Sequence, residues 1–176
     1  EAGGVMPAAV ELKPWKGGGK WISALDVRDL TGQESRTDRP CVELLAPLGY
    51  LPSTAGDLEQ LAREGRLSEL APIWCPRGFR CDAASIPRVL WGIYPPWARS
   101  NRAAVLHDYL YTVQPCSRER ADALFREALL SCGVSPVRAW IMWRAVRLGG
   151  GGYWNERTPE AVQAARVAMR HDQALA

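Results

Sequence analysis

The chain has 176 residues, with 22 Lys and Arg against 19 Asp and Glu, which gives a formal net charge of +3. This length indicates one domain with a real hydrophobic core, and 47% hydrophobic with 23% charged residues excludes a disordered protein. The small positive charge does not indicate nucleic acid, because dedicated binders are more basic and their charge is clustered. The sequence contains no run of about 18 apolar residues, so it predicts no membrane-spanning helix.

The first fifty residues predict the strands of a small antiparallel sheet. Short apolar stretches are broken here by Gly and Pro, which is typical of strands joined by turns. Residues 20–27 alternate loosely between apolar and polar side chains, and residues 41–45 form a second candidate strand that Pro47 and Gly49 end. Residues 73–75 predict one more short strand.

A helical insertion is predicted between these strands, at residues 53–72. Asp57 supplies an acidic N-cap and Gln60 the third helical position, so we expect a helix over residues 57–70.

The second half of the chain predicts helices. Residues 102–111 are apolar on nearly every side, which is typical of a buried helix. A second helix follows the capping Ser117 and ends at Gly133. A third begins at Ser135-Pro136 and runs to Gly149, where we interpret four consecutive glycines as a flexible joint. A last helix begins at Thr158-Pro159 and fades at Met169.

The predicted fold class is α+β, a small N-terminal antiparallel sheet followed by a layer of three to four helices. We expect residues 1–155 to form a single domain and residues 156–176 to form a C-terminal helix or tail. The chain begins Glu-Ala-Gly-Gly rather than with Met, from which we expect a trimmed, processed or excised piece. Its five cysteines are too scattered for a disulfide scaffold, so we expect reduced, mostly buried thiols and an intracellular protein.

The most informative motif is His107-Asp108 inside the buried helix. A carboxylate buried without a partner costs several kcal/mol, so Asp108 must be paired, bind a metal or reach a cleft. His107 and Tyr111 share a helix face, whereas Asp108 lies about 100° away. If the next helix returns antiparallel, Asp122 comes back beside His107.

A histidine held by a carboxylate is a competent general base toward water, and Asp108 is then free to bind a hard cation. The other interpretation is a buried polar network that only fixes two helices together.

Residues 77–87 also allow two interpretations, one structural and one functional. Asp82 and Ser85 suit an Asx-type turn, or they form a wall of the same site.

A further candidate is a group of aromatic and basic side chains near the third predicted helix: Trp140, Trp143, Trp154, Arg138, Arg144 and Arg147. Such a face could bind lipid or single-stranded nucleic acid, but it is also typical of a core with a polar rim.

Three ordered motifs resemble the phage and prophage domain-of-unknown-function family 1353: residues 75–87, residues 104–111 and residues 120–125. Residues 145–149 fit the same pattern, so the resemblance covers residues 73–154. It implies a phage or mobile-element context and no assigned activity.

A looser similarity is to secreted and parvoviral phospholipases A2, in which one helix carries His-Asp-x-x-Tyr and a later helix carries Ala-Asp. The resemblance implies that His107 activates water, that Asp122 orients it, that Tyr111 supports them by a hydrogen bond and that Asp108 binds calcium. Leu110 stands where those enzymes have Cys, and no Gly-rich calcium loop precedes the helix.

From these features we expect a phage-type hydrolase-like domain with His107, Asp122 and Tyr111 in catalytic roles, acting on a cell-envelope ester such as phospholipid. Asp108 and Asp82 would bind calcium or another divalent cation, and Ser85 would form part of the wall. The alternative is a non-catalytic virion or accessory protein. We expect a cytoplasmic location in the producing cell, with delivery, virion association and a larger polypeptide left open, and no specific nucleic acid partner.

Overall fold

The computed structural model describes residues 19–30, 41–53, 72–81 and 100–174, with side chains up to residue 168. Its strands are β1 (Lys20–Trp21), β2 (Val27–Asp29), β3 (Val42–Leu44), β4 (Leu48–Leu51), β5 (Ile73–Cys75) and β6 (Arg80–Cys81). Its helices are α2 (Asn101–Val113), α3 (Arg118–Ser131), α4 (Pro136–Asn155) and α5 (Pro159–Ala174). This confirms the α+β class.

The described strands form two antiparallel sheets of three strands, in the orders β1-β4-β5 and β2-β3-β6. The continuous strand predicted over residues 20–27 is therefore wrong, because its two ends pair in different sheets. Ser23 lies in the break, where its Oγ accepts a hydrogen bond from Gly49 N and donates one to Pro47 O.

The strand predicted over residues 41–45 ends before Pro47, as expected, but Gly49 lies inside the next strand, β4. Gly49 pairs with Trp74 across the sheet, and a Cβ at Gly49 would lie 2.5 Å from the Trp74 ring. This glycine is thus required by the close approach of an aromatic ring within a sheet rather than by a turn. The predicted helix over residues 57–70 lies outside the described residues.

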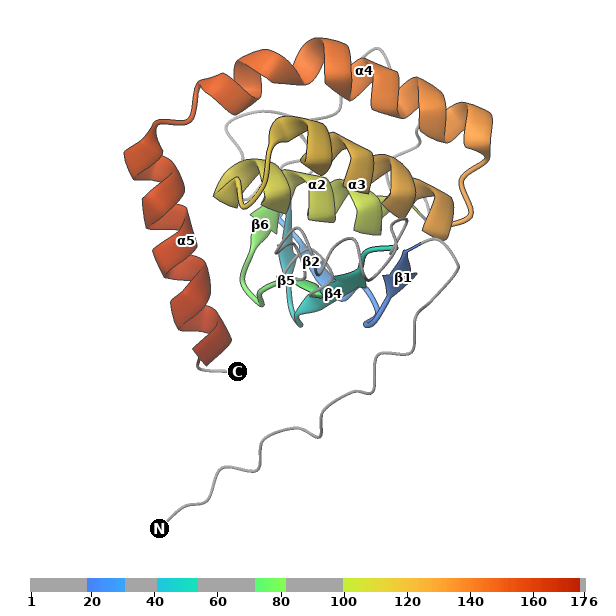
Figure 1. Ribbon diagram of the computed structural model, residues 1–176. Coiled ribbons are helices and arrows are strands. Elements are labelled where there is room, and N and C mark those ends of the chain that lie inside the picture. The colour runs from blue at the N-terminus through green and yellow to red at the C-terminus, as the bar shows by residue number, and fades with distance from the viewer. Residues whose placement is uncertain (1–18, 31–40, 54–71, 82–99, 175–176) are drawn as a thin grey trace, which may run out of the picture.

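Helices α2 and α3 lie between the strands and α4, as Figure 1 shows. Helix α2 packs on β4, β5 and β6 on one side and on α3 on the other, and α4 packs on α3. The hydrophobic core lies around α2, nine of whose 13 residues are buried, as the all-round apolar pattern predicts.

The ends of the helices follow their local sequence signals. Ser117 Oγ accepts a hydrogen bond from Arg120 N at the start of α3, and Gly133 follows its end with φ of +79°, as predicted. Gln114 ends α2 in the left-handed region. Arg166 of α5 donates to the carbonyls of Val113 and Gln114, which holds α5 against this end of α2.

The flexible joint predicted at the four glycines is wrong, because α4 continues through them to Asn155. Gly150 is buried, and a Cβ there would lie 2.7 Å from the Tyr111 hydroxyl. Close packing therefore keeps a poor helix former in a helix, although each glycine costs about 1 kcal/mol relative to alanine. Helix α5 likewise runs to Ala174, beyond the predicted fading at Met169.

None of the helices in the described part of the chain has the length and apolarity needed to cross a membrane.

Candidate functional site

The site lies where α2 and α3 pack against each other. His107 and Tyr111 are one turn apart on α2, and Asp122 faces them from α3. His107 Nε2 lies 2.9 Å from Asp122 Oδ1, and the Tyr111 hydroxyl donates to the same oxygen at 2.7 Å. All three side chains are buried. The structure thus brings together the three residues that the sequence assigned to catalysis, while their catalytic roles stay predictions.

The network has a fourth member, Arg147 of α4. Its Nη1 donates to Asp122 Oδ2 at 3.0 Å and its Nη2 donates to Glu119 Oε1 at 3.2 Å. Sequence reasoning assigned Arg147 to the aromatic and basic face instead. The signal that pointed to it was Asp122 itself, because a buried carboxylate requires a counter-charge and the neighbouring helix offers arginines.

Asp122 is ionised in this environment. Burial acts to raise its pKa, but hydrogen bonds from His107, Tyr111 and Arg147 outweigh burial and hold the pKa of Asp122 below its usual value. The pKa of Tyr111 is raised by burial and by its hydrogen bond to Asp122, so its hydroxyl stays protonated. The pair of Asp122 and Arg147 therefore carries compensating charges inside the helix layer.

His107 is neutral near pH 7. Its burial lowers the pKa below 6.5, even though the hydrogen bond and the charge of Asp122 act to raise it. Because an ionised carboxylate only accepts hydrogen bonds, the ring proton is assigned to Nε2 and the lone pair to Nδ1.

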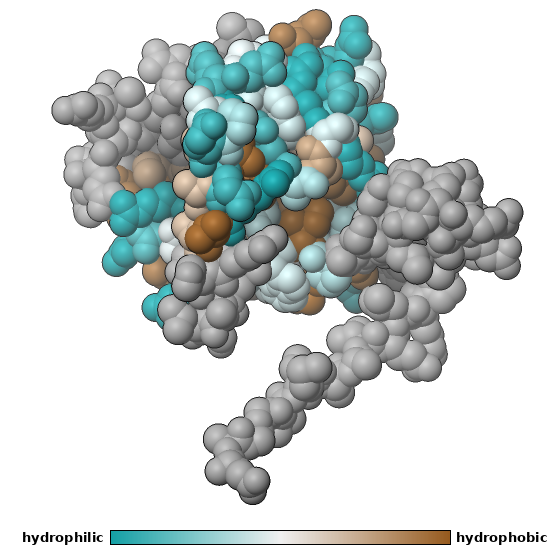
Figure 2. All heavy atoms as spheres, turned by 60° about the vertical axis from the view of Figure 1, so that its left-hand side comes forward, coloured by the Kyte–Doolittle hydropathy of each residue, from teal (hydrophilic) through white to brown (hydrophobic). Residues whose placement is uncertain are grey.

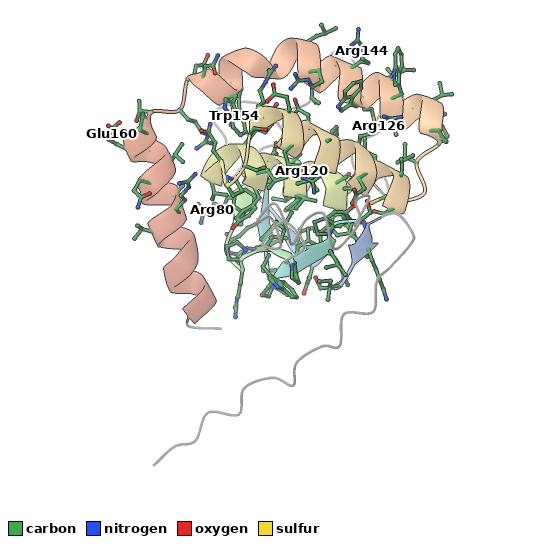
Figure 3. The ribbon with its side chains drawn as sticks, viewed as in Figure 1. Arg80, Arg120, Arg126, Arg144, Trp154 and Glu160 are labelled. Carbon is green, nitrogen blue, oxygen red and sulfur yellow. The ribbon has the colours of Figure 1, made fainter. Side chains whose placement is uncertain are left out.

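Aromatic rings fix the orientation of the imidazole. The His107 ring centroid lies 4.3 Å from that of Tyr111 and 4.6 Å from that of Phe125. Trp154, labelled in Figure 3 near the end of α4, meets the Tyr111 ring edge-on at 4.9 Å. The ring is therefore packed on two sides and held at Nε2, as a positioned base requires.

Asp108 does not join this network. It lies on another side of α2, where its carboxylate accepts a hydrogen bond from the Cys81 thiol of β6. Within the described ranges, no three His, Cys, Asp or Glu side chains are grouped so as to hold a metal ion. Asp82 and Ser85 lie outside the described residues, so calcium binding stays a prediction. The described residues alone do not form a calcium site.

The contact between Gly150 and Tyr111 gives a test of the network by substitution. Gly150→Ala is expected to lower the free energy of unfolding by about 1–3 kcal/mol, because the new methyl group would displace a hydroxyl that Asp122 holds. Gly152→Ala is the matched control. It is expected to raise the free energy of unfolding by about 0.5–1 kcal/mol, since no atom lies within 4 Å of the added Cβ. Urea unfolding measures both, and stabilisation by both variants would contradict the packing described.

In the comparison with protein families, residues 60–146 match the model described as protein of unknown function (DUF1353). This segment includes His107, Tyr111 and Asp122 and ends one residue before Arg147. The search of curated proteins found no match, and neither did the search of solved structures. The phospholipase A2 resemblance thus has no support from these comparisons, whereas the other resemblance is confirmed. Residues 60–146 of the chain therefore belong to the DUF1353 family.

Proposed function

We propose that this protein is a phage-type hydrolase-like domain in which His107, oriented by Asp122, activates water for attack on an ester of the cell envelope, with phospholipid as the first substrate class. The observation that carries the proposal is the orientation of the imidazole. Its Nε2–H is held by an ionised carboxylate at 2.9 Å, which leaves a basic nitrogen on a neutral ring.

The chemistry follows from that arrangement. Nδ1 takes a proton from water as the water oxygen attacks the ester carbonyl, and the imidazolium that forms is stabilised by Asp122. The tetrahedral intermediate then collapses. The imidazolium returns its proton to the departing alcohol oxygen, and the neutral ring is regenerated. A positioned general base of this kind contributes about 10²–10⁴ in rate.

Tyr111 and Arg147 act through Asp122 rather than on the substrate. Their hydrogen bonds to its two oxygens keep the carboxylate ionised and fix its position against His107. We therefore assign them as positioning residues.

A non-catalytic role has one specific observation in its favour. His107 is 1% exposed, and the network joins α2, α3 and α4. A buried cluster of this kind could serve only to lock three helices together in a virion or accessory protein. This alternative predicts no hydrolysis, and a loss of about 1–3 kcal/mol of stability when a buried partner such as His107 is truncated to alanine.

The deciding experiment is the release of fatty acid from mixed phospholipid vesicles, followed by mass spectrometry, with calcium and with a chelator. The informative variant is His107→Gln, because the Gln amide can still donate to Asp122 but offers no base in place of Nδ1. We expect release by the wild-type protein and a loss of at least 100-fold in the variant, with its unfolding curve close to wild type.

Two results would overturn the proposal. One is the absence of any product from the folded wild-type protein, with and without calcium. The other is undiminished product from His107→Gln, which would place the base elsewhere. The calcium and chelator arms decide in the same assay whether a cation is required.

A further inference from the structure

Helix α4 carries apolar side chains on the face that points away from the protein. Its buried positions are Ala139, Met142, Val146 and Gly150. At about 100° per residue, Val137, Arg144 and Leu148 lie on the opposite side, with Trp140 beside them. Val137 is 69% exposed, Leu148 is 79% exposed and Trp140 is 49% exposed. We call these four residues the α4 outer face.

The charged side chains of α4 itself are all arginines. Helix α4 contains no Asp or Glu, and it carries Arg138 and Arg144 in its exposed part. Arg144 lies over the ring of Trp140 at 5.8 Å, and Arg126 of α3 lies over the ring of Trp143 at 5.7 Å. Figure 3 shows Arg144 projecting outward from α4, on the side away from the strands.

The position of this face makes it accessible to a large surface. Helix α4 forms the edge of the molecule opposite the strands, as Figure 1 shows. At this edge Figure 2 shows hydrophobic atoms exposed next to hydrophilic ones. Exposed aliphatic and Trp side chains flanked by arginines are the composition of helices that lie in a membrane interface.

We propose that the α4 outer face binds the surface of an anionic phospholipid bilayer. Val137, Leu148 and the Trp140 ring would enter the boundary between headgroups and acyl chains. Arg138 and Arg144 would meet the lipid phosphates, with their aliphatic stems along the apolar surface.

Two other occupants fit the face less well. A second copy of the chain would bring the arginines of two α4 helices together with no α4 carboxylate to pair them. Single-stranded nucleic acid would use the Trp rings for stacking, but Arg144 already lies over Trp140, and the two most exposed apolar side chains of the face are aliphatic. Anionic lipid accounts for both the aliphatic and the basic side chains.

This inference deepens the proposed function and rests on it for the identity of the lipid as substrate. The surface would hold the protein on the bilayer that contains the ester. Binding is measured on diether phospholipids, which have no ester to hydrolyse, so failure of binding and failure of catalysis are distinguishable.

The test is co-sedimentation with vesicles of diether phosphatidylglycerol and phosphatidylcholine, and with vesicles of diether phosphatidylcholine alone. We expect binding to the anionic vesicles that weakens at high salt. Trp140→Ser combined with Leu148→Ser is expected to weaken it at least tenfold, and Arg144→Gln about fivefold. The matched controls are Val167→Ser, an exposed aliphatic residue on α5, and Arg77→Gln, an exposed arginine between β5 and β6. Both are expected to bind as wild type does.

Equal binding to both kinds of vesicle, no binding at all, or full binding by the double variant would overturn this inference. The inference would also be overturned if the double variant lost self-association, or lost binding to a single-stranded oligonucleotide, while its binding to vesicles stayed the same. His107→Gln is expected to bind as tightly as wild type. Binding without hydrolysis of diester vesicles would overturn the proposed function alone.

Discussion

Asp122→Ala is expected to lower the free energy of unfolding by about 3–5 kcal/mol, because it breaks a buried ion pair and leaves three donors without their acceptor. Arg147 would lose the partner at 3.0 Å, and the donors of His107 and Tyr111 would face a cavity in a fully buried position. Denaturant unfolding monitored by circular dichroism gives the value, provided that the slope with denaturant is unchanged.

The control uses the other carboxylate on the same arginine. Glu119 accepts a hydrogen bond from Arg147 Nη2, but its side chain is 70% exposed. Glu119→Ala is therefore expected to lower the free energy of unfolding far less than Asp122→Ala, because solvent screens an exposed salt bridge. If the two variants lower the free energy of unfolding equally, or if Asp122→Ala lowers it by under about 1 kcal/mol, the network does not hold the three helices together.

The sequence was sufficient to predict the α2–α3 half of the site. The apolar stripe of α3 defines a face, Ser117 and Gly133 mark where the helix begins and ends, and a short connection between neighbouring helices requires an antiparallel return. These local signals place Asp122 beside His107, and the structure has this contact.

Arg147 could not be placed in the same way. Its contact with Asp122 depends on the rotation of α4 against α3, which is set by packing between residues distant in sequence. Part of that packing is the approach of Gly150 to Tyr111, in a run of glycines whose local preference is to end a helix. Gly49 is a similar case, because its role in β4 depends on Trp74 of another strand. In both places tertiary contacts override a local signal.

The free energy of unfolding is also expected to fall as the pH is lowered from 7. Burial holds the pKa of His107 in the folded state below 6.5, so between 6.5 and that lower value the unfolded chain binds a proton that the folded protein does not. The stabilisation is fully present above 6.5 and is lost as the pH falls through the folded pKa, by up to about 1.4 kcal/mol per pH unit. Asp122 adds a loss of the same sign below about 3.8, since its pKa is also lowered.

Substitution of each histidine isolates the contribution of His107 to this dependence, because the chain contains only two. Unfolding curves are measured between pH 8 and pH 5. The free energy of unfolding is expected to change less steeply with pH for His107→Gln than for wild type. His171→Gln serves as the control for the other imidazole. A slope larger in His107→Gln than in wild type would mean that the folded protein binds the ring proton more tightly than the unfolded chain does. In that case Asp122 would be holding an imidazolium, and the neutral base on which the proposed water activation depends would not exist at pH 7.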